Sequence, residues 1–180
     1  MAQSTVGKYL HRQRKPPSQT WRTFLQNHAQ QMASMDFFTV PTATFRILFV
    51  LVVLSHDRRR VVHFNVTEHP TEEWTAQQIR EAFPWDQVPR YVIRDRDAIF
   101  GNEVVATTKG MCLDHVIVWN AKSLRGTLEE YFFYYERSRT HLGLGKDTPE
   151  ARAVEKPEEG RVVSIPQVGG LHHRYQRRAA

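Results

Sequence analysis

Two aspartates in apolar surroundings are the residues of this sequence that are best suited to chemistry. Asp36 lies inside the strand-like run 32–42, and Asp95 follows a second apolar run, 91–93, just before a turn. Because an unpaired carboxylate is costly to bury, two of them suggest a shared cation that neutralises both. Carboxylate oxygens are ligands of Mg²⁺, and such a site supports phosphoryl transfer. The spacing alone favours the alternative that each Asp is a strand-end or capping residue.

Three segments give these aspartates a context, and they occur in the order 32–42, 91–101 and 129–144. They resemble the first acidic motif, the second acidic motif and the last helix of the integrase core of DDE transposases and retroviral-type integrases. The resemblance is closest to bacterial insertion-sequence transposases, and it extends over about 20–149. The third segment ends in a pattern similar to the Y-N-x-x-R-x-H-x-x-L close of that core.

The resemblance implies a ribonuclease-H-like fold and metal-dependent transfer of DNA phosphoryl groups, with DNA ends and target DNA as partners. Two Mg²⁺ (or Mn²⁺) ions, about 3.5–4 Å apart, stabilise the attacking and leaving oxygens in such reactions. In the family two aspartates and a glutamate hold these ions. Asp36 and Asp95 correspond to the two aspartates, so the resemblance makes them the catalytic and metal-binding residues of this chain.

The glutamate that completes the family's acidic triad has no counterpart in the expected place. The chain passes from a part that resembles the segment after the second aspartate to a part that resembles the region beyond the glutamate helix, with the join near 111/112. This pattern indicates an internal deletion. Glu130 stands 35 positions after Asp95, a spacing typical of the third acid, but Glu130 and Glu129 are expected on the solvated side of the last helix. Glu103 is expected to be too near Asp95 in the chain to come from a separate helix. We therefore expect weak metal binding and impaired catalysis.

The composition favours a soluble protein with a polyanionic partner. The chain has 180 residues, a formal net charge of +6 and a pI of about 9.7, which fits a nucleic acid partner or a merely solubilising excess of basic residues. Cys112 is the only cysteine, which excludes a disulfide framework and a zinc site built on several cysteines. The basic N-terminal residues are followed by no apolar signal region, and the apolar run 47–54 is too short to span a bilayer. These features predict a cytoplasmic location.

The hydrophobic pattern predicts an α/β fold with a mixed sheet. Three antiparallel strands are followed by a helix that Thr71 caps and Pro84 ends, and then by a fourth, parallel strand. The clearest helix carries the apolar stripe Leu124, Leu128, Tyr131, Phe132 and Tyr135. The expected elements are strands over 33–40, 45–54, 61–66 and 90–94 and helices over 21–31, 71–83 and 121–137, with a strand or a helical turn over 113–119.

Three regions follow from this pattern: a basic linker over 1–19, an integrase-core domain over 20–150 that is truncated near 111/112, and a basic tail over 151–180. The tail arginines Arg174, Arg177 and Arg178 contact DNA phosphate or are simply solvated. Loss of a strand and a helix removes packing that a domain with about 5–15 kcal/mol of stability cannot spare. We expect the chain to be unstable or to self-associate, alone or with a full-length relative. A non-catalytic nucleic-acid-binding remnant and a degenerate gene product are the alternatives to an active recombinase.

Overall fold

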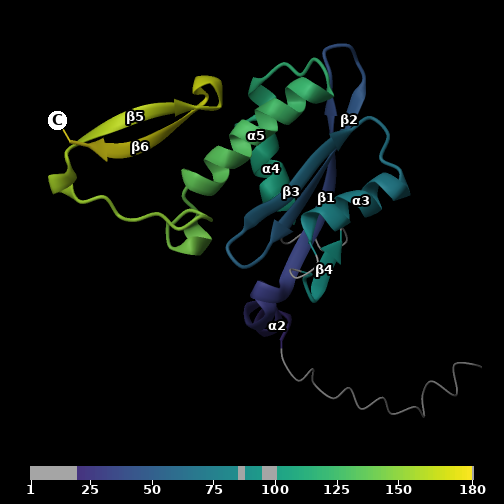
Figure 1. Cartoon of the computed structure of the whole chain (residues 1–180), viewed down its shortest axis with the longest axis horizontal. Coiled ribbons are helices and arrows are strands. Elements are labelled where there is room, and N and C mark those ends of the chain that lie inside the picture. The colour runs from purple at the N-terminus through teal and green to yellow at the C-terminus, as the bar shows by residue number, and fades with distance from the viewer. Residues whose placement is uncertain (1–19, 85–87, 95–100, 180) are drawn as a thin grey trace, which may run out of the picture.

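A four-stranded mixed sheet forms the centre of the chain in the computed structural model, which describes residues 20–84, 88–94 and 101–179. The strands are β1 (Met32–Pro41), β2 (Ile47–Ser55), β3 (Arg60–Thr67) and β4 (Tyr91–Arg94), in the spatial order β3-β2-β1-β4. β1 and β3 are antiparallel to β2, whereas β4 is parallel to β1. The predicted α/β class, with three antiparallel strands and one parallel strand, is confirmed (Figure 1).

Helices cover both faces of this sheet. One face packs against α3 (Glu72–Ala82), and the other packs against α4 (Gly101–Met111) and α5 (Ala121–Arg137), as Figure 1 shows. α2 (Trp21–His28) and a 3₁₀ turn (Ala29–Gln31) precede β1. β2 lies between two strands and beneath helices on both faces, which explains its unbroken apolar run, because a strand covered on both faces needs apolar side chains at every position. Alternation along β1 and β2 divides their side chains between the two faces.

The α4/α5 face contains most of the core. Phe38, Val50 and Val52 from the sheet pack there against the buried stripe of α5, whose members are Leu124, Leu128, Tyr131, Phe132 and Tyr135. The predicted stripe and the predicted bounds of this helix are both confirmed. A capping box begins the helix, because Asn120 accepts a hydrogen bond from the Ser123 backbone N–H at 2.9 Å and the Ser123 hydroxyl accepts one from the Asn120 N–H at 3.1 Å.

The α3 face has a smaller apolar cluster, formed by Met35, Leu51, Val53 and Ala82 with Trp74 and Phe83 packed against it. The predicted N-cap of α3 is confirmed, since the Thr71 hydroxyl accepts a hydrogen bond from the Trp74 backbone N–H at 3.2 Å.

The C-terminal region folds differently from the basic tail that the sequence suggested. β5 (Arg161–Gln167) and β6 (His172–Arg178) form an antiparallel hairpin, joined by a 3₁₀ turn over Val168–Gly170. Gly169 and Gly170 adopt positive φ angles of 61° and 92° in this turn, a conformation that glycine reaches without steric cost. Short turns over Leu142–Leu144 and Pro157–Glu159 connect α5 to the hairpin.

Two boundaries also differ from expectation. β2 begins at Ile47 and not at residue 45, because Phe45 has a φ of 60° in the turn between β1 and β2 and its side chain is 94% exposed. Residues 113–119 form a 3₁₀ turn over Leu113–His115 followed by irregular backbone, so the helical-turn alternative holds for the first part of this segment. In this segment Val118 is buried, whereas Ile117 is 72% exposed.

Candidate acidic site at the end of strand β4

Asp36 occupies the middle of β1, at the point where its parallel neighbour ends. Arg94, the last residue of β4, is the register partner of Met35, and Asp36 is the next residue along β1. On its other side Asp36 pairs with Val52 of β2. Phe38 and Val52 belong to the core beneath α4 and α5, so alternation places Asp36 on this face of the sheet as well. The side chain is neither fully buried nor fully exposed.

Asp95, the second predicted acid, lies outside the described residues. It follows Arg94 directly in the sequence, and consecutive Cα atoms of a chain are about 3.8 Å apart. β4 therefore brings the chain to Asp36 one residue before Asp95.

Neither Glu129 nor Glu130 belongs to this part of the molecule. Both are exposed on α5, as expected, and together with Phe133 they line a hollow of about 700 Å³ that they share with residues 166–170 of the hairpin turn. No residue of β1 or β4 lines this hollow. The spacing of 35 positions between Asp95 and Glu130 is thus not accompanied by a position beside Asp36.

Glu103 differs from its sequence-based expectation. It lies in the first turn of α4, which is a helix separate from β4, although it was expected to be too near Asp95 in the chain for this. α4 packs beside β1, so the backbone of Glu103 belongs to an element on the same face as Asp36. The side chain of Glu103 lies outside the described part of the chain.

A cation close to this face was not indicated by the sequence. Lys109, in the last turn of α4, holds its ammonium nitrogen 5.4 Å from the centre of the Phe38 ring, and Phe38 follows Asp36 by two residues on the same face. A lysine above an aromatic ring gains a modest electrostatic attraction. Nothing in the local pattern around Lys109 distinguishes it from a solvated lysine, since the contact depends on how α4 packs.

The described residues of this region include oxygen donors of the kind that a hard divalent cation takes. Asp36 offers carboxylate oxygens of the type that Mg²⁺ takes. On the same face the Ser34 hydroxyl is buried and has no hydrogen-bond partner among the described residues. Within 20–84, 88–94 and 101–179 no group of three or more His, Cys, Asp or Glu side chains could hold a metal ion.

The segment that resembles the family's closing pattern packs as structure. Tyr135 and His141 are buried and their rings meet edge-on at 4.7 Å, and the Arg139 guanidinium lies 5.7 Å from the Tyr135 ring centre. The Arg139 guanidinium lies within hydrogen-bond distance of His141 Nδ1, at 3.2 Å. These side chains close the end of α5 against the following turn.

Arg58 connects the turn that follows this segment, 147–149, to the sheet. From the turn between β2 and β3 it donates to the carbonyl oxygens of Thr148 and Pro149, each at 2.8 Å, and to the Asp147 carboxylate at 2.6 Å. Asp147 also accepts from the backbone N–H groups of Thr148 and Arg152, and these hydrogen bonds, with that from Arg58, lower its pKa.

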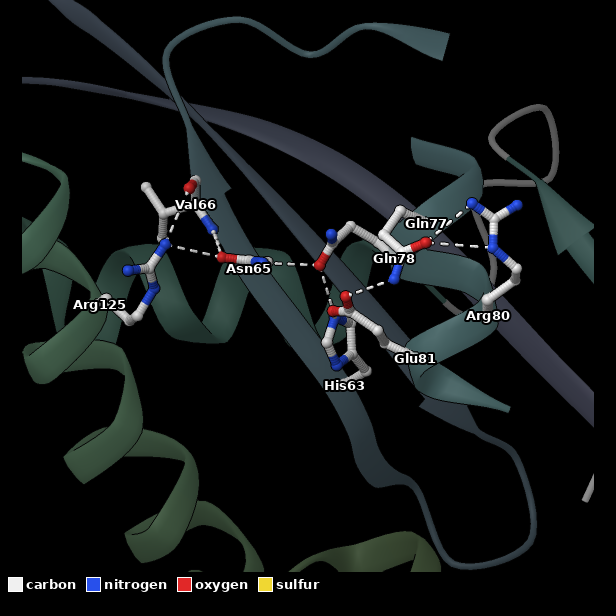
Figure 2. Close-up of polar contacts among 8 residues, drawn as sticks. All are labelled: His63, Asn65, Val66, Gln77, Gln78, Arg80, Glu81 and Arg125. Atoms are coloured by element: carbon white, nitrogen blue, oxygen red, sulfur yellow. Dashed lines mark hydrogen bonds and ion pairs between the residues drawn. The ribbon is translucent and has the colours of Figure 1, made fainter. Parts of the chain in front are cut away.

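A second polar cluster lies over the edge strand β3, on the α3 side (Figure 2). The side-chain oxygen of the buried Gln78 accepts hydrogen bonds from His63 Nε2 at 2.8 Å and from Asn65 Nδ2 at 2.6 Å. The Asn65 oxygen accepts in turn from the Val66 backbone N–H and from Arg125 of α5, both at 2.8 Å. The Asn65 amide is thereby bonded at both ends, which joins α3, β3 and α5. The cluster therefore serves to hold these three elements together, and it contains no evident nucleophile or pair of acids.

Comparisons with known proteins add no family to this description. A scan against protein-family models finds no match, and a search of curated proteins finds none either. None of the described helices has the length and apolar character needed to cross a membrane.

Proposed function

We propose that this chain is a DNA transposition protein of the DDE integrase-core type, with a ribonuclease-H-like sheet, that keeps the acidic pair Asp36 and Asp95 but lacks the third acid. One observation carries the proposal. Parallel pairing of β4 with β1 places Arg94 opposite Met35, and these two residues directly precede Asp95 and Asp36 in the sequence.

Two further observations support it. The order β3-β2-β1-β4, with one parallel pair at the β1 edge, is compatible with a ribonuclease-H-like fold. The helical part of the closing segment packs on the sheet, because Tyr131, Phe132 and Tyr135 share one buried apolar cluster with Phe38 of the first resembling segment.

We expect catalysis to be impaired because, among the described side chains, no third carboxylate has been placed beside Asp36 and Asp95. Glu130 and Glu129 face the hairpin turn, and a site with two carboxylates holds one hard cation weakly. In-line displacement on DNA needs charge stabilisation at both the attacking and the leaving oxygen. The proposed protein therefore binds DNA and one Mg²⁺ or Mn²⁺ ion but catalyses strand transfer poorly or not at all.

The test separates metal binding from catalysis. Mn²⁺ binding is measured by electron paramagnetic resonance on the wild type and on Asp36→Asn, Asp95→Asn and the control Asp114→Asn, an exposed carboxylate between α4 and α5. We expect weak binding that each of the first two variants reduces about tenfold, because each removes one charged ligand, and that the control leaves unchanged. Binding that is indifferent to Asp36 and Asp95 would end the proposal.

Catalysis is measured as Mg²⁺-dependent nicking and joining of duplex DNA, with Glu103→Gln and Glu130→Gln alongside the wild type. The expected result is no activity above that of Asp36→Asn. Clear activity that disappears in Asp95→Asn and in one of the glutamate variants would show that a complete triad exists and that the chain is a working recombinase.

A non-catalytic DNA-binding role is the second candidate, and one specific feature favours it. Residues 161–180 contain four arginines and no acidic residue.

A further inference from the structure

The C-terminal hairpin is anchored at its turn end and projects from the body at its open end. His172 donates a hydrogen bond from Nε2 to the Met111 carbonyl at 2.8 Å, and its ring stacks on Tyr134 with 4.4 Å between ring centres and 3° between planes. Val168 packs against the core near the same turn. Figure 1 shows the opposite end of the hairpin, where the chain terminates, lying away from the sheet.

The arginines of the hairpin fall into two classes. Arg174 and Arg177 are half-buried and serve the hairpin itself. Arg177 donates to the Gly160 carbonyl at 2.9 Å, and its backbone N–H bonds the Glu155 carboxylate. The pKa of Glu155 is lowered mainly by its hydrogen bond from Arg152, then by that N–H, with a smaller contribution from the charge of Arg174. These two arginines are therefore internal partners of the fold.

Arg161 and Arg178 form the second class. They are direct cross-strand partners at the open end, both side chains are exposed, and neither makes a salt bridge with a described residue. Gly160 brings the two strands together here, with a φ of 120° and a backbone so close to Arg178 that a Cβ would lie 2.1 Å from its carbonyl oxygen. Like charges placed opposite each other across a strand pair destabilise it. Two cations thus lie side by side with no salt-bridge partner among the residues that the structure describes.

Acidic side chains near this end do not cancel the charge. Glu159 accepts a hydrogen bond from the Lys156 backbone N–H at the short turn before the hairpin, and Glu158 is exposed beside it. Over 151–180 the six arginine and lysine residues exceed the three glutamates, so this region supplies half of the formal net charge of the chain, +3 of +6.

We propose that the open end of the hairpin is a binding surface for the phosphate backbone of DNA, with Arg161 and Arg178 as its contacts. The inference deepens the function proposed above, since it names the surface through which that DNA is held. An arginine pair spaced by a strand pair, about 5 Å apart at the backbone, offers donors to phosphates of one strand. Phosphate also relieves the repulsion that the free hairpin carries, and its counterions are released on binding. The contacts are independent of base sequence.

The experiment uses the full chain and a short fluorescent duplex, with affinity measured by anisotropy over a range of salt concentrations and without divalent metal. Arg161→Gln/Arg178→Gln should weaken binding about tenfold and lower the slope of log K against log salt by roughly 0.9 for each lost phosphate contact. The charge-matched control is Arg80→Gln/Arg90→Gln, which removes two exposed arginines outside the hairpin, one in α3 and one directly before β4. The control should keep both the affinity and the slope close to wild type.

A single substitution separates binding from folding. Arg161→Glu places an opposite charge across from Arg178, so amide hydrogen exchange within 161–178 should slow while DNA affinity falls. Loss of affinity with slower exchange cannot come from unfolding of the hairpin. Unchanged DNA affinity in the double variant, or an equal loss in the charge-matched control, would overturn the proposal.

A third result would also overturn it. If wild type but not Arg161→Glu bound poly-glutamate, and both bound DNA equally, the surface would belong to an acidic protein. These readouts are independent of Mn²⁺ binding at Asp36. If Mn²⁺ binding did not depend on Asp36 while DNA binding still depended on Arg161 and Arg178, only the proposed acidic site would be rejected.

Discussion

The sheet body and the C-terminal hairpin are held together by different kinds of interaction. The body buries a continuous apolar core beneath α4 and α5, whereas the hairpin has two strands, no core of its own and a few specific contacts at its turn. A lone two-stranded hairpin is at best marginally stable in water. The body therefore sets the global stability of the chain, and the hairpin is a local unit whose position depends on individual side chains.

The largest expected effect is a loss of stability in the sheet body. Leu128 is fully buried in α5, so Leu128→Ala should lower the free energy of unfolding by about 2–5 kcal/mol through lost transfer energy and a cavity. Urea denaturation followed by circular dichroism measures this loss. Lys122→Ala, on the exposed side of the same helix, should change stability by less than about 0.5 kcal/mol. Similar values for the two variants would mean that α5 does not carry the core.

Disrupting the hydrogen-bonded cluster of His63, Asn65 and Gln78 over β3 should have the next largest effect on stability. Gln78→Leu removes the acceptor that the half-buried His63 Nε2 and Asn65 Nδ2 share, leaving His63 with the Glu81 carboxylate at 3.8 Å, and the two lost hydrogen bonds should together cost about 1–3 kcal/mol. The same denaturation assay applies. The control is Gln77→Leu, at the neighbouring exposed position that Figure 2 shows bonded only to residues of its own helix. An unchanged stability for Gln78→Leu would show that water replaces the lost acceptor.

A smaller effect should separate the hairpin from the body. His172→Ala removes one hydrogen bond and one ring stack, together worth about 1–2 kcal/mol. We expect the body to melt almost as in wild type while thiol labelling of Cys112, which follows Met111 and is buried, becomes faster. His173→Ala, at the exposed neighbouring position, is the control. Labelling that stays at the wild-type rate in His172→Ala would contradict the anchoring role.

The smallest effect concerns the pH dependence of the body. Burial raises the pKa of Cys112 from 9.0 to about 11, with the negative charge of Glu130 adding to the shift. The folded state therefore favours the thiol, so the contribution to stability is complete below pH 9 and is lost as the pH rises towards 11. At pH 10 the loss should be about 1 kcal/mol relative to Cys112→Ala, measured by urea denaturation. Parallel pH profiles for the two proteins would show that the thiol is not shielded.

Most of the sheet was predictable because burial imposes a short-range pattern on the sequence. The apolar runs of β1, β2 and β3, the cap at Thr71 and the stripe of α5 are each encoded within a few residues. The hairpin was missed although its Val-Ile alternation and its Gly169-Gly170 turn are present. The arginines and histidines of β6 dominate its composition, and their burial depends on α5 and on Met111.

The candidate site likewise has residues that the sequence indicated and residues that it did not. Asp36 could be singled out as a carboxylate within an apolar strand, and the structure places it within β1, next to the register partner of Arg94. Glu130 shows the limit of spacing as a guide, because its side chain lies at the hairpin turn. The contact of Lys109 with Phe38 and the separation of the four hairpin arginines into internal and outward-facing pairs had no sequence signal.

The order of residues by itself determined the four strands of the main sheet, which of their faces are apolar and that a carboxylate stands within the first of them, since these follow from local alternation and from the cost of burying charge. Only the tertiary structure decided that the C-terminal residues form a hairpin, that this hairpin lies against α5, and that Arg161 lies opposite Arg178. Such neighbours are brought together by packing between residues distant in the chain, and no local pattern records that packing.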